Sequence, residues 1–208
     1  MASPPSVRLP SLDEISKSSS DDDEWTALKT VVSTLFEHSP VLNEHLIPPL
    51  TASTTSAAFT SYADLIDRSA SIIRSWPPNL QSSFISGHPR IGEQDPGQLS
   101  ALSAEEQARY STPAWVIERL GWLNGVYEGR YRGLRYITFV NGRTRKEVME
   151  EMEGALGVEK AKGPEWKQLK AEGEVMEVGG EEWLNELERA VGEVILIAKG
   201  RVSKLGLV

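Results

Sequence analysis

The sequence contains no cysteine in 208 residues, which excludes disulfide bonds, thiolate nucleophiles and cysteine-ligated zinc or iron–sulfur sites. Histidine is also rare, and the three histidines present do not have the spacing of metal ligands. Neither a Gly-x-Gly-x-x-Gly phosphate loop nor a paired-carboxylate calcium loop is found. We therefore expect no metal and no nucleotide cofactor, and a chemistry that uses ordinary side chains.

Positive charge and long apolar runs are scarce as well. The formal net charge is -8, so we expect no nucleic-acid partner, because binding to phosphates needs a clustered positive surface. No stretch approaches the roughly 18 apolar residues of a membrane span, and no basic segment followed by an apolar run begins at Met1. Ser203-Lys204-Leu205 resembles a peroxisomal address, but further residues follow it. We expect a cytoplasmic protein without a membrane partner.

Apolar residues recur at three- and four-residue steps along most of the chain, which is the spacing of amphipathic helices. Leu134 to Val140 is rich in β-formers, and we expect it to be extended without forming a sheet, because one isolated strand cannot form one. The expected fold is therefore all-α, a single-domain multi-helix bundle. The pattern predicts helices near residues 25–36, 59–76, 115–127, 144–156 and 181–198, with short apolar stretches at 41–46 and 80–85 and a further helix from Ser103.

Three segments depart from the helical pattern. Residues 1–22 are rich in Ser, Pro and Asp, which predicts a flexible or loosely packed arm before a domain over residues 23–208. Pro48-Pro49 is expected to stop the stretch at 41–46, and Thr51 to Ser56 to be turn-like. Between Gly157 and Gly180 the chain is charged and glycine-punctuated.

The segment Gly87-His88-Pro89-Arg90-Ile91-Gly92 is the first candidate for chemistry. Pro89 biases His88 away from the helical backbone, and the two glycines permit a tight path that projects the ring into a cavity. A histidine alone on an apolar face is more often a satisfied core residue, but these neighbours disfavour a packing role. His88 is therefore a candidate acid or base.

The segment Ser103-Ala104-Glu105-Glu106-Gln107 adds a carboxylate and an amide to the same polar region. Ser103-x-x-Glu106 is also a capping box, and spacing alone does not decide between capping and catalysis for Glu106. Gln107 has two interpretations too, as a donor to a substrate carbonyl or as a residue that faces water. Both residues stay as candidates.

Arg143 lies just before a second capping-box pattern, Thr144-Arg145-Lys146-Glu147. The free amides and the dipole of a helix N-terminus favour anions, so a carboxylate would bind well beside this guanidinium. The alternative is an exposed arginine in a basic turn.

These pieces together resemble the 2-oxo-4-hydroxy-4-carboxy-5-ureidoimidazoline (OHCU) decarboxylases of urate breakdown. The likeness rests on the order and spacing of five elements along the chain. They are Phe36-Glu37-His38-Ser39-Pro40, Gly87-His88-Pro89, Ser103-x-x-Glu106-Gln107, Leu123-Asn124-x-x-Tyr127 with Arg130-Tyr131 and Gly133, and Gly142-Arg143-Thr144. One departure is Arg90-Ile91-Gly92, where many members carry Asp-Leu-Ala after His-Pro. A second is the charged stretch 159–179, which is longer than in compact relatives and is expected to form an excursion near the surface.

The resemblance implies a cofactor-independent, usually dimeric helical enzyme that decarboxylates this small-molecule substrate to (S)-allantoin. By position, His88, Glu106 and Arg143 would be catalytic. The substrate-binding candidates are Pro89, Gln107, Ile137, Thr138 and Phe139. One alternative is a non-catalytic helical interaction module, which would show an exposed apolar groove instead of a cavity shared by the three catalytic candidates. A hydrolase is a weaker alternative, because no nucleophile set is recognisable.

Overall fold

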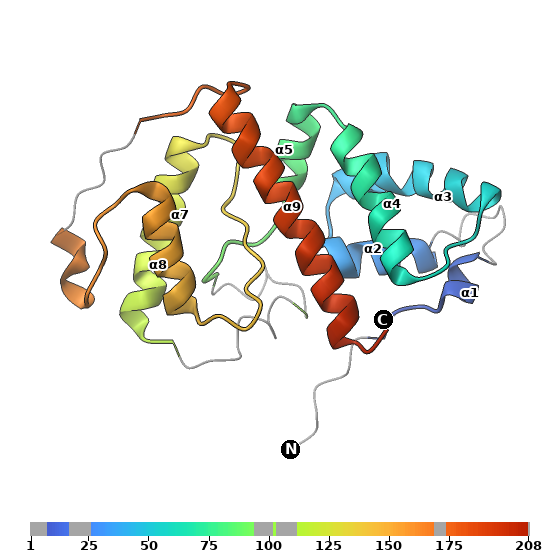
Figure 1. The fold of residues 1–208 in the computed structure, drawn as a ribbon, viewed down its shortest axis with the longest axis horizontal. Coiled ribbons are helices and arrows are strands. Elements are labelled where there is room, and N and C mark those ends of the chain that lie inside the picture. The colour runs from blue at the N-terminus through green and yellow to red at the C-terminus, as the bar shows by residue number, and fades with distance from the viewer. Residues whose placement is uncertain (1–7, 17–25, 94–101, 103–111, 169–173, 208) are drawn as a thin grey trace, which may run out of the picture.

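The structure is a computed structural model that describes residues 8–16, 26–93, 102, 112–168 and 174–207. These residues form helices and connecting segments, with no strand among them, which confirms the predicted all-α class (Figure 1). A π-helical turn, η1 (Leu42–Leu46), and a 3-10 turn, η3 (Pro164–Gln168), accompany the α-helices. The α-helices are α1 (Leu12–Ser16), α2 (Thr26–Phe36), α3 (Ile47–Ser56), α4 (Tyr62–Ser75), α5 (Pro78–Ser86), α7 (Ala114–Arg130), α8 (Arg145–Leu156) and α9 (Glu181–Lys204).

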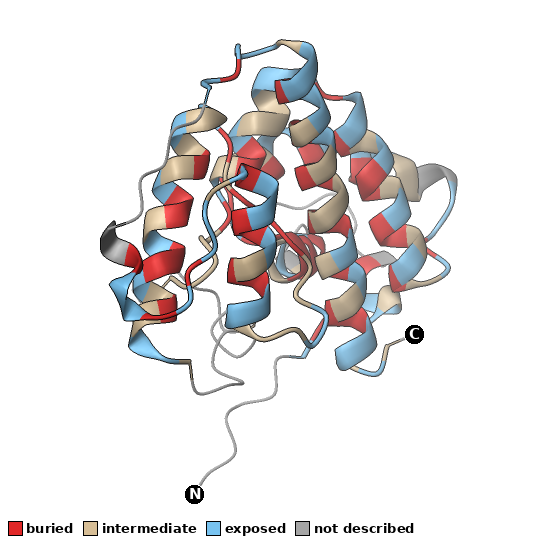
Figure 2. Ribbon diagram, turned by 60° about the vertical axis from the view of Figure 1, so that its left-hand side comes forward, coloured by how far each residue is buried: buried red, intermediate tan, exposed pale blue. Residues whose placement is uncertain are grey.

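Helix α9 is the centre of the bundle. It packs against α2, α4 and α5, while α7 pairs with α8 on its other side (Figure 1). Its buried stripe includes Leu187, Val191, Val194 and Ala198, at the three- and four-residue steps seen in the sequence. Buried residues cover the inward faces of the surrounding helices (Figure 2). Although α9 has 24 residues, neither it nor another helix in the described part of the chain is long and apolar enough to cross a membrane.

The predicted stop at Pro48-Pro49 and the predicted turn at Thr51 to Ser56 are wrong. The chain continues from η1 directly into α3, and proline occupies the first turn of that helix. Proline is tolerated there because a first-turn amide has no partner within the helix anyway. The hydroxyl of Thr51 donates to the Ile47 carbonyl at 3.1 Å, so this polar side chain is satisfied inside the helix.

Capping residues set the ends of two helices as the sequence indicates. Thr144 forms the predicted capping box with Glu147 at the start of α8, in which each side chain accepts a hydrogen bond from the other residue's amide. Gly157 ends α8 in the left-handed conformation, with φ of 66°. Ser61 caps α4 by accepting a hydrogen bond from the Asp64 amide. These local signals therefore hold in the folded chain.

Residues 8–16 lie within the segment expected to be a loosely held arm, and they dock on the domain. Leu9 and Ile15 are buried in the core, and Ile15 belongs to the short helix α1. The Tyr62 hydroxyl donates to the Pro10 carbonyl at 2.5 Å. This stretch of the arm is therefore part of the packed structure, and the rest of residues 1–22 lies outside the described residues.

Residues 134–140 run outside any helix as an extended segment and form no sheet with the other described residues, as the sequence predicts (Figure 1). Leu134, Tyr136 and Ile137 are buried, so the main chain here needs hydrogen-bond partners. Helix α9 supplies them through side chains. Arg189 donates to the Ile137 carbonyl at 2.9 Å, and the Phe139 amide donates to Glu193 at 2.6 Å.

Gly200 on α9 lets the extended segment 134–140 lie close to this helix. A Cβ added at Gly200 would come within 2.6 Å of Phe139 Cε2 and 2.8 Å of Cζ. We expect Gly200→Ala to lower the free energy of unfolding by about 1–3 kcal/mol, measured by urea denaturation, because the Phe139 ring must shift. Gly192→Ala is the matched control on the same helix, since an added Cβ there meets nothing within 4 Å. Equal effects of the two substitutions would contradict this account.

The connection after α8 is held by an ion pair that is completely buried. Arg119 on α7 donates to Glu153 on α8 at 2.8 Å, and both side chains have 0% exposure. Arg119 also donates to the Glu159 carbonyl at 2.8 Å, and Glu153 accepts from the Ala161 amide at 3.0 Å. Trp166 is buried, and the centroid of its ring lies 5.2 Å from Cζ of the Arg119 guanidinium. The first part of the expected surface excursion is therefore anchored in the interior.

Candidate active site

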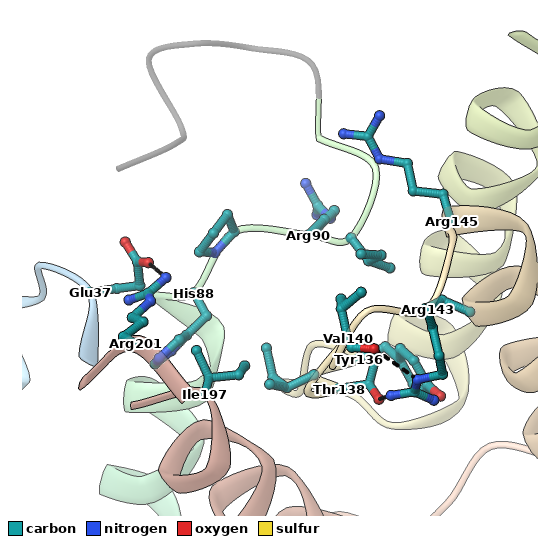
Figure 3. Close-up of a pocket in the computed structure, with 14 residues that line it drawn as sticks. Glu37, His88, Arg90, Tyr136, Thr138, Val140, Arg143, Arg145, Ile197 and Arg201 are labelled. Atoms are coloured by element: carbon teal, nitrogen blue, oxygen red, sulfur yellow. Dashed lines mark hydrogen bonds and ion pairs between the residues drawn. The ribbon is translucent and has the colours of Figure 1, made fainter. Parts of the chain in front are cut away.

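A cavity of about 90 Å³ lies where five segments meet. They are the end of α2, the loop after α5, the extended segment 134–140, the start of α8 and the last turns of α9 (Figure 3). Apolar walls come from residues such as Ile91, Val148 and Ile197. The ionisable residues that line it are Glu37, His88, Arg90, Tyr136, Arg143, Arg145 and Arg201.

His88 lies in this cavity with a defined tautomer. Its Nδ1 is 3.0 Å from the Phe84 carbonyl oxygen, and because a carbonyl only accepts, Nδ1 carries the proton. The Phe84 ring packs edge-on against the imidazole, with centroids 4.8 Å apart. Nε2 is buried and has no hydrogen-bond partner among the described residues. A buried acceptor without a partner is rare in proteins, and here it offers a lone pair to a ligand.

Burial also fixes the charge of this imidazole. His88 is 5% exposed, and burial lowers its pKa to about 4, although the Phe84 carbonyl and the nearby Glu37 carboxylate favour the proton. The guanidinium groups of Arg201 and Arg135 add to the lowering. His88 is therefore neutral at pH 7 and able to accept a proton.

This low pKa predicts a pH dependence of stability. Between pH 6.5 and about pH 4 the unfolded chain binds a proton at His88 that the folded chain does not, so stability falls as the pH falls through this window. The difference between 6.5 and about 4, at ~1.36 kcal/mol for each pH unit, corresponds to about 3 kcal/mol. We therefore expect the free energy of unfolding, measured by urea denaturation, to fall less between pH 7 and pH 4.5 for His88→Gln than for the parent. Parallel losses would show that His88 does not titrate in this way.

Glu37 and Arg201 form a buried ion pair beside His88 (Figure 3). Arg201 also donates to the carbonyls of Thr34 and Leu35, at 3.0 and 3.2 Å, and so caps the end of α2. Glu37 follows that helix with a backbone φ of 66°, a conformation that residues other than glycine rarely adopt. The ion pair compensates for this strain, which places a carboxylate and a guanidinium at the cavity wall.

Arg143 also lines the cavity, but its guanidinium is already bonded. It donates to Thr138 Oγ1 at 3.0 Å, to the Val140 carbonyl at 3.1 Å and to the Phe139 carbonyl at 2.5 Å. A further ion pair joins it to Glu151 on α8. Arg143 therefore shapes the turn between the extended segment and α8, and its charge faces the cavity from that wall.

The structure brings most of the predicted site residues together. His88, Arg143, Pro89, Ile137 and Thr138 all line the one cavity. The side chains of His88 and Arg143 approach it from opposite walls (Figure 3).

Three other predicted residues do not line this cavity in the described structure. Phe139 lines a neighbouring hollow together with Gly200 and Lys204. Glu106 and Gln107 lie outside the described residues. The predicted convergence of three catalytic side chains is therefore seen for two of them.

The lining of the cavity contains more positive than negative side chains. Four arginines and one glutamate line it. Three of these arginines form ion pairs, Arg201 with Glu37, Arg143 with Glu151 and Arg90 with Glu128. Burial lowers the pKa of the Arg145 guanidinium, but an arginine keeps its charge at neutral pH. A small anion fits such a site, because fixed positive charge in a walled hollow attracts negative ligands.

Two residues that line the cavity, Glu37 and Arg201, were not among the predicted site residues. A signal for Arg201 was present, because it follows Val194 and Ala198 at helical spacing on the buried stripe of α9. A charged residue on an apolar stripe needs a buried partner. Nothing local marks Glu37 as that partner, since it lies 164 positions away in the chain.

One family model matches most of the chain. The family model described as OHCU decarboxylase matches residues 23–172, which include the end of α2, the His88 loop, the extended segment and Arg143. The last helix, with Arg201, lies beyond the matched range. No curated protein matches the chain.

Proposed function

Since the chain belongs to the OHCU decarboxylase family, a family of urate degradation, we propose that it converts OHCU to (S)-allantoin by removing the carboxylate. The observation that carries this proposal is His88, a buried neutral imidazole whose Nε2 has no described partner in an arginine-lined cavity. Such a site can take an anionic substrate and accept a proton from it. The described residues give no comparable support to an interaction module.

The substrate supplies its own electron sink. When the bond between the ring carbon and the carboxylate breaks, carbon dioxide leaves and the electron pair moves into the ring toward the imine nitrogen. The resulting enol-type intermediate has a double bond between this carbon and the neighbouring carbon of the former imine, and it is planar at that neighbour, which becomes the stereocentre. A proton must then be added on one face to give a single enantiomer. The enzyme therefore needs a base, an acid and groups that hold the anion.

We assign the base to His88, which takes the proton from the substrate hydroxyl at Nε2. A substrate carboxylate bound beside the imidazole would raise its proton affinity from the low value of the empty cavity. Glu106 is proposed to orient the ring and to deliver the proton to the new stereocentre. Arg143 stabilises the developing negative charge through the field of its guanidinium.

Substrate positioning is proposed to come from the two walls of the cavity. Pro89 and the backbone of Ile137 and Thr138 line it directly and would hold the ureido arm. Gln107 and Phe139 remain proposed contacts from the sequence. Of these two, Phe139 faces the neighbouring hollow that shares Thr138 with the cavity.

A rate measurement with freshly generated OHCU tests the proposed reaction. Carbon dioxide release should rise in proportion to protein concentration when the protein is far below the substrate concentration, because each molecule turns over repeatedly. Heat-denatured protein is the control for non-specific catalysis. Release at the spontaneous rate with folded protein would refute the proposed activity.

We also propose a homodimer, as the family resemblance implies. The chain has a mass of 23.0 kDa, so light scattering coupled to size-exclusion chromatography would report twice this value. A mass of 23.0 kDa at assay concentrations would show that the monomer is the working form.

A further inference from the structure

The carbonyl of His88 is held by an arginine from a distant segment. Arg135, in the extended segment, donates from Nη1 to the His88 carbonyl oxygen. Among the described residues, the Arg135 side chain makes this hydrogen bond and no ion pair within 4 Å. The His88 amide in turn donates to the Ile85 carbonyl at 3.1 Å. Both main-chain polar groups of His88 are therefore fixed from outside the residue.

The residues after His88 are held as firmly. Arg90 makes a two-pronged ion pair with Glu128 on α7, at 2.6 and 2.8 Å. Asn124, also on α7, donates to the Ile91 carbonyl at 3.0 Å. The loop therefore has a rigid attachment on its far side, and Arg135 provides the attachment at His88 itself.

We propose that Arg135 is a positioning residue for the reaction, which holds the His88 main chain so that the imidazole presents Nε2 to the substrate. This inference rests on the proposed function. Arg135 lies outside the residues that line the cavity, so it acts through His88 and not by touching the substrate. A displacement of about 1 Å in a catalytic group can cost about a hundredfold in rate.

Arg135 also acts through its charge. The charged groups that influence His88 are Glu37 at the end of α2, Arg201 on α9 and Arg135 on the extended segment. The positive charge of Arg135 disfavours a second positive charge on the imidazole. Removing that charge should move the protonation of His88 to higher pH, whereas a lysine that keeps it should not.

Two substitutions separate positioning from charge. We expect Arg135→Met to lower kcat about tenfold with a change in KM below about threefold, because the substrate's own contacts remain. In the pH profile of kcat/KM, the acid limb of Arg135→Met should move to higher pH. Arg135→Lys should keep the acid limb of the parent and lose part of kcat, since a lysine ammonium does not reproduce the planar guanidinium. Arg132→Met is the matched control, because Arg132 is an exposed arginine in the same region.

Nuclear magnetic resonance of ¹⁵N-labelled His88 gives a readout that does not need turnover. In folded Arg135→Met, the His88 imidazole should protonate at higher pH than in the parent and in Arg132→Met. The inference would be overturned if folded Arg135→Met had the same kcat as the parent and its His88 titrated at the same pH as in the parent. An inactive parent with the expected shift in titration would instead refute the proposed function and leave the role of Arg135 in holding His88 intact.

Discussion

Replacing His88 with asparagine is expected to lower kcat for OHCU decarboxylation by about 10²–10⁴-fold, the usual contribution of a positioned acid or base. Asparagine is polar and of similar size, but it has no lone pair that accepts a proton at neutral pH. The environment that makes His88 neutral is burial under the Phe84 ring, with Nδ1 committed to a carbonyl. Initial rates with freshly generated substrate at pH 7 would measure the loss.

His38→Asn is the matched control for this experiment. His38 is exposed at the end of α2 and does not line the cavity, so its substitution should leave the rate unchanged. Circular dichroism would establish that both variants are folded. A folded His88→Asn protein with the parental rate would remove His88 from the mechanism.

The Arg119→Met substitution is expected to destabilise the protein by about 3–5 kcal/mol, because it leaves the Glu153 carboxylate buried without its cation. Both side chains of this pair have 0% exposure, and both also bind the main chain of residues 159–161. The guanidinium lies 4.2 Å from the centroid of the Trp122 ring, so packing is lost together with charge. Urea denaturation would measure the change in the free energy of unfolding.

An exposed ion pair on α8 is the control for that prediction. Lys146 and Glu150 are 2.8 Å apart with side-chain exposures of 55% and 41%. Glu150→Gln should therefore change the free energy of unfolding by less than about 1 kcal/mol. Similar effects of Arg119→Met and Glu150→Gln would show that the buried pair does not hold the connection after α8.

The fold was predictable from the sequence where local chemistry determines it. The helical stripe of α9 and the capping box at Thr144 are both local signals, and both are present in the structure. The error at Pro48-Pro49 has a local cause too, because a proline pair fits a first helical turn as well as a stop. The extended segment was predicted, but its partners were not, since Arg189 and Glu193 lie more than fifty positions away.

The site was predictable to a similar degree. His88 stood out because proline and glycine surround it, and Arg143 because it precedes a helix N-terminus. The ion pair of Glu37 with Arg201 depends on the packing of α2 against α9, which no local spacing reveals. Nothing in the local sequence marks Arg135 either, and only the tertiary structure places it on the His88 carbonyl.

Burial is the main reason why His88 stays neutral, although the nearby Glu37 carboxylate favours the proton. The guanidinium groups of Arg201 and Arg135 add to the lowering of the pKa, because an imidazolium would be a further positive charge near them. The same positive field attracts a carboxylate, which then assists protonation of His88 during the reaction.

The optical activity of the product tests the central claim most directly. Freshly generated OHCU should be converted by the parent protein to allantoin with an excess of the (S) enantiomer, because protonation occurs on one face inside the cavity. His88→Asn and a sample without protein should give slow formation of racemic allantoin. Racemic product at equal rates in all three samples would contradict the assignment of this cavity as the active site.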